Sequence, residues 1–207
     1  MSRYRRSAII AVCSLIATAF VWFDHNYQWR GQPPQPTSRE QAYSYDFPKY
    51  HGKTFKVVKV VDGDTLDIDI PDANYTHTRI RLLGIDTPET KNRKIGVMYY
   101  GPQASDFAKE MALGKDITVY LDTVSSTRDK YKRLLAYIQL QDGNFLNEVL
   151  VSEGFAYADL RFKHSYYKKY TQLGSAAQKQ KKGLWQNVTR DQLPEWLQRE
   201  KPKLLNK

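Results

Sequence analysis

Hydrophobic and polar positions follow three different patterns along the 207-residue chain. An apolar run stands near the N-terminus, a polar stretch follows it, and a longer region mixes two periodicities. In that region, short runs of β-branched residues predict strands, and apolar residues three and four positions apart predict helices. The predicted strands are 55–61, 66–70, 78–85, 117–121 and 133–140, and the predicted helices are 102–113, 145–153 and 165–182.

The order of these elements is three strands, one helix, two strands and two helices. Five short strands with an inserted helix predict a Greek-key β-barrel of the oligonucleotide-binding type (an OB-fold), accompanied by three α-helices. The predicted fold class is therefore α+β. A domain over residues 53–187 is long enough to bury about two-thirds of its unfolded surface, so it needs no disulfide to fold.

A turn signal, Asp62-Gly63, separates the first two strands. If the second and third strands form a hairpin centred near Tyr75, Asp64 lies opposite Asp86 at one end of it. Opposed like charges destabilise a sheet unless a cation lies between them, and carboxylate oxygens suit Ca²⁺ or Mg²⁺. Alternatively, an asymmetric loop shifts the register and the two carboxylates never meet.

Arg81 interrupts the apolar run of the third strand. Strict alternation places Arg81 on the opposite face from Asp86, unless a bulge near Gly84 brings the two onto one face. Otherwise the long side chain of Arg81 must reach around the strand. A purely structural alternative is an ion pair with Asp69, which lies opposite Arg81 in the same register.

Basic residues outnumber acidic ones, with 32 Lys and Arg against 22 Asp and Glu, and the formal net charge is +10. This excess favours a polyanionic partner, either a nucleic acid or an anionic membrane surface. The single cysteine is Cys13. It excludes an intramolecular disulfide and a zinc site built on several thiolates.

The apolar run over residues 8–23 follows three arginines, Arg3, Arg5 and Arg6. This arrangement is typical of a secretory signal or a membrane anchor. Ala-Thr-Ala at 17–19 resembles a cleavage site, whereas the apolar residues that continue beyond it favour an anchor. The positive-inside rule keeps the arginines cytoplasmic, so residues beyond 23 are expected outside the cytoplasm, either anchored to the membrane or secreted after cleavage.

Two polar segments flank the predicted domain. Residues 24–52 include a proline-rich stretch that cannot join a helix, and they are expected to form a linker. Residues 188–207 are expected to form a basic C-terminal tail, either solvated or serving as an extra nonspecific contact to nucleic acid. Within this tail, Pro194 suits the first position of a short helix.

Five short motifs point to one family of proteins. They are Val-Asp-Gly-Asp-Thr at 61–65, Arg-Leu-Leu-Gly-Ile-Asp-Thr-Pro-Glu-Thr at 81–90, Tyr-Gly-Pro-Gln-Ala-Ser at 100–105, Asp-Lys-Tyr-Lys-Arg at 129–133 and Leu-Ala-Tyr-Ile at 135–138. In this order and at this spacing, they resemble staphylococcal nuclease and its thermonuclease family over residues 55–185. Any one motif is weak evidence, but the set is specific.

The resemblance implies a calcium-dependent phosphodiesterase that cleaves DNA and RNA and has the OB-fold barrel with three helices. It implies that the carboxylates of Asp64 and Asp86 and the backbone carbonyl of Thr87 bind Ca²⁺. Calcium that contacts a phosphate oxygen acts as a Lewis acid and orients the ester. We expect such a nuclease to show little sequence specificity and to act as a monomer.

The same resemblance assigns three catalytic residues. Arg81 and Arg133 bind the scissile phosphate, and Glu89 orients or deprotonates the attacking water. A guanidinium group donates two parallel hydrogen bonds to phosphate, which lysine cannot reproduce. Removing one such preorganised donor typically lowers the rate on the order of 10²–10³-fold.

Positions that bind the nucleotide match the family less completely. The resemblance implies that Lys130 and Tyr131 contact the terminal phosphate of a bound nucleotide, and Phe162 falls near a position that stacks on a base. Lys132 stands where the reference nuclease has a glycine, so the turn before Arg133 is expected to differ in shape.

Two other classes of function compete with an exported nuclease. A non-catalytic OB-fold module that binds nucleic acid would be expected to lack some of the catalytic and metal-binding residues, and none is missing. A protein of the membrane surface would carry its basic residues beside the apolar run, but residues 31–38 contain no charged residue.

Overall fold

The computed structural model describes residues 38–90 and 96–205 of the chain. The predicted signal or anchor over residues 1–23, and residues 24–37 of the predicted linker, lie outside this part. Within the described residues, no helix is both long and apolar enough to span a membrane. From Arg39 onward the chain forms one compact unit.

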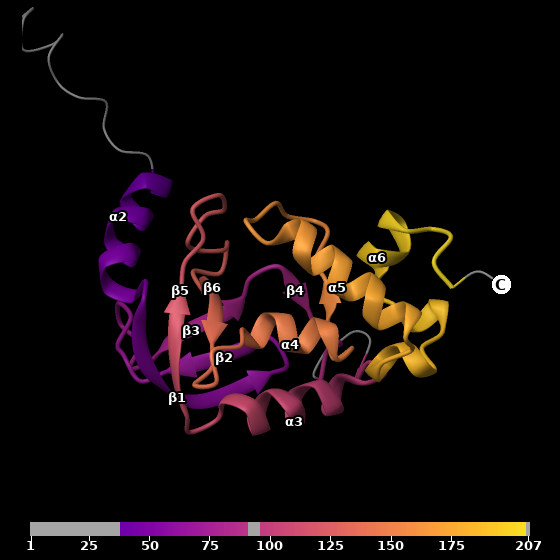
Figure 1. The fold of residues 1–207 in the computed structure, drawn as a ribbon. Helices are drawn as coiled ribbons and strands as arrows, with labels where there is room; N and C mark the ends of the chain where they lie inside the picture. The colour runs from indigo at the N-terminus through magenta and orange to yellow at the C-terminus, as the bar shows by residue number, and fades with distance from the viewer. Residues whose placement is uncertain (1–37, 91–95, 206–207) are drawn as a thin grey trace, which may run out of the picture. The chain divides into compact units, whose positions relative to one another are not determined.

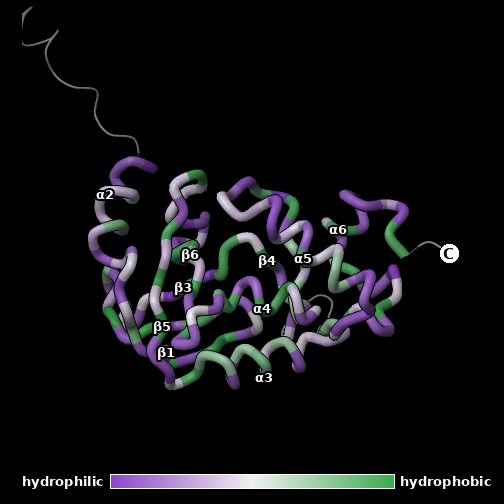
Figure 2. Tube along the Cα trace, in the orientation of Figure 1, coloured by the Kyte–Doolittle hydropathy of each residue, from purple (hydrophilic) through white to green (hydrophobic). Residues whose placement is uncertain are grey.

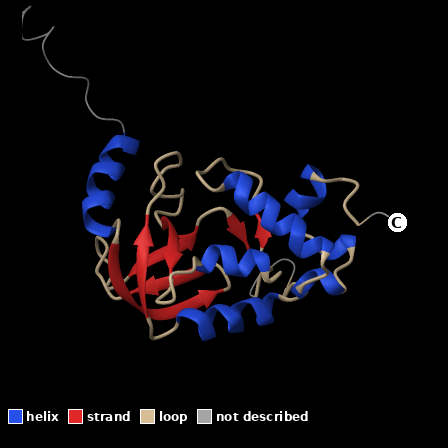
Figure 3. Cartoon of the chain, viewed as in Figure 1, coloured by secondary structure: helices blue, strands red, loops and turns tan. Residues whose placement is uncertain are grey.

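Five strands close into the predicted barrel (Figure 1; Figure 3). In spatial order they are β1 (Lys53–Asp62), β2 (Thr65–Ile68), β3 (Thr78–Leu82), β6 (Leu134–Gln139) and β5 (Asp116–Tyr120). Neighbouring strands pair antiparallel, except β3 and β6, which are parallel. The α+β barrel predicted from the strand pattern is confirmed.

Three helices stand where the sequence predicts them. They are α3 (Gly101–Ala112), α4 (Leu146–Ser152) and α5 (Tyr167–Lys179). Pro102 lies in the first turn of α3, where its missing N–H is not needed. α3 packs on β1, and α4 packs on α3, α5 and β6. Figure 2 shows hydrophobic residues recurring along α3 and the barrel strands.

Alternation along β3 directs its side chains to the two sides of the barrel wall. Thr78, Ile80 and Leu82 are buried, whereas Arg79 is exposed and Arg81 half-buried. The large buried side chains of the main core come from all the barrel strands and from α4; they include Ile68, Ile80, Leu82, Ile117, Leu134, Ile138 and Leu146. Arg81 therefore projects away from this core.

The predicted linker is wrong for its second half, because residues 38–50 form helix α2 (Ser38–Tyr50). Tyr50 is fully buried, and its hydroxyl lies 3.0 Å from Oγ1 of Thr78 on the barrel. Asp46 is also fully buried and pairs with Arg128, whose Nη2 lies 2.7 Å from Oδ1. These contacts stabilise a helix whose polar composition suggests a linker.

The register assumed for the second and third strands is also wrong. β2 and β3 pair Thr65 with Arg81, and the backbone N–H of Leu82 donates to the carbonyl of Asp64 at 2.8 Å. Asp64 therefore lies beside Leu82 rather than opposite Asp86. The ion pair between Arg81 and Asp69 does not form, because the observed register places Arg81 opposite Thr65, and Asp69 accepts a hydrogen bond from the backbone N–H of Lys56.

The C-terminal segment is packed rather than solvated. Two 3₁₀-helices (Gly183–Gln186 and Arg190–Gln192) lead into helix α6 (Glu195–Glu200), and Pro194 is its N-cap rather than its first residue. A second hydrophobic cluster forms here from buried side chains of α5, β7 and this segment, namely Tyr157, Ala177, Leu184, Trp185, Val188, Leu193, Trp196 and Leu197. The expectation of a solvated tail is therefore wrong for residues 188–200.

Candidate active site

A sharp turn at Gly84 brings Asp86 back toward Arg81. The chain leaves β3 at Leu82, turns, and enters the short strand β4 (Ile85–Asp86), which pairs with β7 (Tyr157–Ala158). Gly84 has φ +79°, and a Cβ there would lie 2.4 Å from Cε1 of the buried His164. Both the conformation and the space require glycine. A turn, rather than the predicted bulge, therefore joins Arg81 and Asp86.

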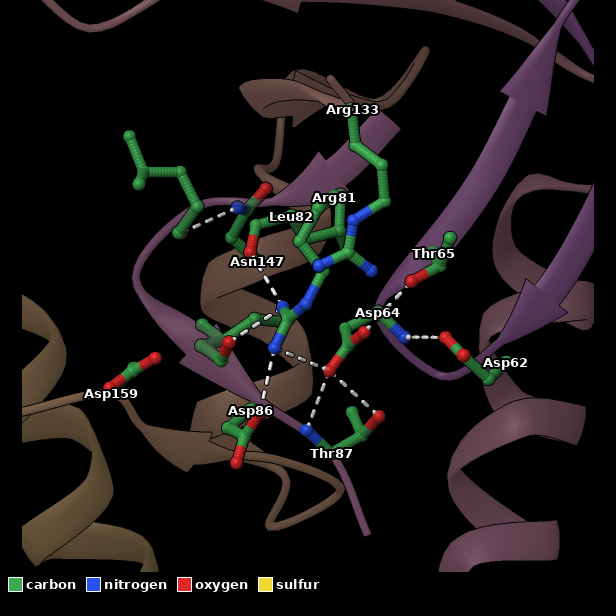
Figure 4. Close-up of polar contacts among 12 residues, drawn as sticks. Asp62, Asp64, Thr65, Arg81, Leu82, Asp86, Thr87, Arg133, Asn147 and Asp159 are labelled. Atoms are coloured by element: carbon green, nitrogen blue, oxygen red, sulfur yellow. Dashed lines mark hydrogen bonds and ion pairs between the residues drawn. The ribbon is translucent and has the colours of Figure 1, made fainter. Parts of the chain in front are cut away.

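The carboxylates of Asp64 and Asp86 converge on one nitrogen atom of Arg81 (Figure 4). Nη2 of Arg81 lies 3.0 Å from Oδ2 of Asp64 and 2.7 Å from Oδ1 of Asp86. Its Nη1 donates to the backbone carbonyls of Leu82 and Ile85 at 2.9 and 2.8 Å. The two aspartates thus meet at one point, although by a route that differs from the predicted hairpin register.

Thr87 is held against Asp64. Its backbone N–H and its hydroxyl both donate to Oδ2 of Asp64, at 2.8 and 3.1 Å. A Cβ on Gly63 would lie 2.9 Å from the side chain of Thr87, so the glycine of the Asp-Gly turn allows this close approach. The structure therefore brings together all three predicted metal-ligating residues, Asp64, Asp86 and Thr87.

The surroundings of Arg81 carry an excess of negative charge. Burial raises the pKa of Asp86 to about 6; Arg81 lowers this pKa and Asp64 raises it. Burial, and then the charge of Asp64, likewise raise the pKa of Asp62 to about 6. Five carboxylates interact here with three guanidinium groups: Asp62, Asp64, Asp86, Glu89 and Asp159 against Arg81, Arg133 and Arg161.

This set of donors fits a hard divalent cation in chemistry and charge, since calcium prefers several oxygen ligands. Within residues 38–90 and 96–205, however, no three His, Cys, Asp or Glu side chains are grouped closely enough to hold a metal ion by themselves. The carboxylates of Asp64 and Asp86 would need oxygen ligands from elsewhere, such as the backbone carbonyl of Thr87, water or a phosphate.

Glu89 follows the β4 strand and is exposed, although Thr87 and Pro88 before it are buried. Partial burial raises the pKa of Glu89, as does the charge of Asp64, while Arg81 and Arg133 lower it. Glu89 therefore lies within electrostatic reach of Asp64, Arg81 and Arg133. Its backbone carbonyl accepts a hydrogen bond from the N–H of Met98 at 2.9 Å, which fixes the chain at this point.

Arg133 is held by a single side-chain hydrogen bond. Its Nε donates to Oδ2 of Asp129 at 2.7 Å, and Oδ1 of Asp129 accepts the backbone N–H groups of Tyr131 and Arg133. The two terminal nitrogens of Arg133 form no hydrogen bond within the described residues, so the guanidinium fork is available to an anion. Lys132 has φ +66° and thus adopts the left-handed conformation that a glycine takes without strain.

Lys130 and Tyr131 lie beside Arg133. The ring centre of Tyr131 is 5.0 Å from Nζ of Lys130 and 5.5 Å from Cζ of Arg133, and the residue is 68% exposed. Next to them opens a groove of about 820 Å³. Its walls come from α2, from β2, β3 and the loop between them, and from the segment before β6, and include Tyr45, Asp46, Asp72, Tyr75, Arg79, Arg128, Tyr131 and Arg133.

Phe162 is 61% exposed, and its ring centre lies 5.6 Å from Cζ of Arg161. Tyr170, eight positions further along the chain, is fully buried and stacks on Tyr166, so its ring is not available to stack on a base from solution. Among the nucleotide-binding positions predicted here, Phe162 thus keeps an exposed ring, while Lys130 and Tyr131 lie on the side of Arg133.

Three residues beside Asp86 are not predicted from the sequence: Asp159, Arg161 and Trp196. Arg161 donates Nε and Nη2 to Asp159, each at 2.8 Å, and its Nη2 lies 3.3 Å from Oδ1 of Asp86. Nε1 of Trp196 donates to Oδ2 of Asp86 at 2.7 Å. The apolar spacing of Leu193, Trp196 and Leu197 is the one sequence signal that Trp196 is buried.

Known proteins are similar to this chain over part of its length. The family model described as staphylococcal nuclease homologue matches residues 79–187. A thermonuclease of Staphylococcus hyicus is 38% identical over 136 residues, covering 65% of this chain and 77% of the relative. An uncharacterized endonuclease of Escherichia coli is 34% identical over 155 residues, covering 72% of this chain and 84% of the relative.

Proposed function

The chain belongs to the staphylococcal nuclease family, and on this premise we propose that it is a calcium-dependent nuclease that hydrolyses DNA and RNA with little sequence specificity. One observation supports this most strongly. The paired carboxylates of Asp64 and Asp86 lie in one electrostatic group with Glu89 and with Arg133, whose guanidinium fork is open. Such a group can hold a cation, a phosphate and a water molecule side by side.

The two arginines have different parts in the proposed reaction. Arg133 offers two terminal nitrogens to the scissile phosphate, because Asp129 holds only its Nε. A planar fork of this kind matches two phosphate oxygens. Arg81 donates to Asp64, Asp86 and two carbonyls, so it mainly fixes the carboxylates and adds positive charge near the phosphate.

In the proposed reaction, Glu89 orients or deprotonates the attacking water. Its side chain is exposed, and its pKa is raised by partial burial and by Asp64. A raised pKa makes a carboxylate a better proton acceptor near neutral pH. Arg81 and Arg133 keep the carboxylate ionised by opposing that shift.

Calcium, when bound, would supply Lewis-acid stabilisation of the phosphate oxygens. The carboxylates of Asp64 and Asp86 and the backbone carbonyl of Thr87 would hold it. The excess of carboxylates over guanidinium groups around Arg81 supports a divalent cation there. Phosphate binding and activation of the water are assigned to Arg81, Arg133 and Glu89.

The groove beside Tyr131 is the proposed path of the substrate strand. It begins at Arg133 and is lined by the exposed rings of Tyr45, Tyr75 and Tyr131. Aromatic rings stack on bases of any sequence and cations follow the backbone, which suits a nonspecific nuclease. Lys130 is placed to contact a phosphate of the same strand.

The location of the enzyme is also a proposal. Three arginines before the apolar run at 8–23 favour export, with the catalytic residues outside the cytoplasm, either anchored or released. Protease added to intact spheroplasts should degrade the anchored form. Protection of the chain until the membrane is lysed would contradict this topology.

The experiment for the activity is to incubate the purified full chain with DNA and with RNA, with calcium or with excess chelator. We expect both polymers to be degraded only with calcium. Glu89→Gln protein, purified in the same way, should be much less active, which excludes a contaminating nuclease. Full activity in chelator would contradict the role of the metal. Binding of both polymers without cleavage would favour the non-catalytic OB-fold alternative.

A further inference from the structure

The C-terminal segment makes a direct contact with the proposed metal-binding residues. Trp196 lies in α6, beyond the residues 79–187 that match the family model. Its indole N–H donates to Oδ2 of Asp86 at 2.7 Å, and the residue is only 6% exposed. A segment outside the residues that match the family model thus contributes a partly buried hydrogen bond to a predicted calcium ligand.

Arg161 contacts both Trp196 and Asp86. Its Cζ lies 4.7 Å from the ring centre of Trp196, within the range of a cation–π interaction. Its Nη2 is 3.3 Å from Oδ1 of Asp86, and Asp159 holds it in place through two hydrogen bonds. Trp196 and Arg161 therefore fix each other as well as Asp86.

The surrounding packing gives Trp196 little freedom to move. Leu193, three positions before Trp196, and the adjacent Leu197 are buried in the same cluster as Trp185. Before α6, Thr189 and Gln192 form a reciprocal capping box that fixes the preceding 3₁₀-helix. The packing of α6 and of the residues before it thus fixes the indole of Trp196 beside Asp86.

We propose that Trp196 is a positioning residue of the active site, so that the C-terminal segment 188–200 is a part of the calcium site. Trp196 holds Oδ2 of Asp86, and Oδ1 then faces Nη2 of Arg81, the atom that Oδ2 of Asp64 also contacts. A carboxylate with a fixed orientation loses less rotational freedom when it binds a cation. Partners of metal ligands, when removed, typically weaken metal binding or activity about 10–100-fold.

The chemistry of the indole suits this task. It is a neutral donor with no acceptor, so it stabilises the carboxylate without adding positive charge beside a cation. Arg81 and Arg161, by contrast, hold Asp86 through charges that oppose a divalent ion. This inference rests on the proposed function, because it assigns a residue to the calcium site of the same nuclease.

The test compares Trp196→Phe with Trp185→Phe in the full chain. Phenylalanine keeps an aromatic ring beneath Arg161 and removes the N–H. Trp185 belongs to the same hydrophobic cluster, but its buried Nε1 forms no hydrogen bond within the described residues. Trp185→Phe therefore reproduces the loss of packing without touching Asp86.

We expect Trp196→Phe to weaken calcium binding, measured by titration calorimetry, about tenfold, and Trp185→Phe to leave it unchanged. At limiting calcium, kcat/KM should fall only in Trp196→Phe, and saturating calcium should restore it. Trp196→Phe should lower the melting temperature at least as much as Trp185→Phe, because it loses the hydrogen bond to Asp86 as well as packing. Terbium, used as a probe for calcium, should show emission excited through tryptophan in wild type and Trp185→Phe but little in Trp196→Phe.

Equal calcium affinity in the two variants and the wild type would overturn the inference and leave the nuclease proposal intact. The contact of Trp196 would then only anchor the C-terminal segment. Failure of the wild type itself to bind calcium would overturn both proposals. A weaker affinity that saturating calcium cannot compensate in kcat/KM would also contradict a role in positioning Asp86.

Discussion

The floor of the site and its rim are held in opposite ways. We use floor for Asp64, Arg81, Asp86 and Thr87, and rim for the exposed Glu89, Lys130 and Tyr131 together with the half-buried Arg133. On the floor, Arg81 donates to two carboxylates and two carbonyls, and Asp64 accepts three hydrogen bonds or ion pairs at Oδ2 alone. Each floor residue therefore supports the fold as well as the proposed chemistry.

The rim is fixed mainly by its backbone. The side chain of Arg133 has one hydrogen bond, to Asp129, and the carboxyl of Glu89 has none within the described residues. Their positions depend on the turn at Lys132 and on the hydrogen bond from Met98. This difference predicts that substitutions on the floor change both stability and activity, whereas substitutions on the rim change activity alone.

Arg81→Met should have the largest effect. It leaves the buried carboxylates of Asp64 and Asp86 without their shared cation, and breaking one side of such a buried pair lowers the free energy of unfolding by about 3–5 kcal/mol. Denaturant unfolding would measure this loss, and nuclease activity should disappear with it. Arg199→Met is the control, because its ion pair with Glu195 is long and exposed and contributes about 0–1 kcal/mol. Equal losses in the two variants would show that Arg81 is not a structural part of the floor.

Arg133→Ala, a substitution on the rim, should lower activity much more than stability. We expect kcat/KM to fall on the order of 10²–10³-fold, as when one preorganised donor is removed. The free energy of unfolding should change by about 1 kcal/mol, because only the partly exposed pair with Asp129 and the contact with the exposed ring of Tyr131 are lost. Arg133→Lys keeps the charge but not the fork and should restore little activity. Full activity of Arg133→Lys would mean that charge alone is needed.

Gly84→Ala tests whether the turn, rather than any side chain, places Asp86 on the floor. A Cβ would meet the ring of His164 at 2.4 Å, and φ is +79°. The conformation lowers the free energy of unfolding by about 1 kcal/mol and the overlap by about 1–3 kcal/mol more. Activity should fall too, because a shift of about 1 Å in a site can lower the rate on the order of 10²-fold.

Gly143→Ala is the matched control for Gly84→Ala. Gly143 has φ +85°, but nothing lies within 4 Å of its Cβ position. It should show the effect of conformation alone, about 1 kcal/mol, with normal activity. Unchanged activity in Gly84→Ala would mean that Asp86 keeps its place without this turn.

The barrel and the three main helices are predictable because alternation and helical spacing are local properties of the sequence. The loop between β2 and β3 is different. Its turn is closed by the bridge between Asp72 and Tyr75, earlier than the assumed centre, and no alternation pattern fixes that point. The predicted pairing of Asp64 with Asp86 therefore fails as a register, while the turn at Gly84 brings the two together.

Elements that depend on distant contacts are the ones that sequence reasoning misses. Tyr43, Phe47 and Tyr50 have helical spacing, but Pro48 and the polar neighbours conceal it, and α2 is stabilised by the barrel. Trp196 reaches Asp86 across 110 positions. A local pattern can predict that Trp196 is buried, but not that it bonds to Asp86.

Lys132→Gly should have the smallest effect, and its sign tests how the rim is fixed. Lys132 has φ +66°, and the left-handed conformation costs an L-residue about 1–2 kcal/mol. Glycine removes that strain but makes the unfolded chain more flexible, which costs about 0.5–1 kcal/mol. The net expectation is a gain in the free energy of unfolding of a few tenths to about 1 kcal/mol, or a melting temperature up to about 2–4 °C higher.

Lys130→Gly is the control. Lys130 lies two positions earlier and has no positive φ, so glycine there relieves no strain, makes the unfolded chain more flexible and should destabilise the protein. Thermal unfolding of both variants measures the contrast, and a shift of the same sign in both would mean that the turn before Arg133 stores no strain.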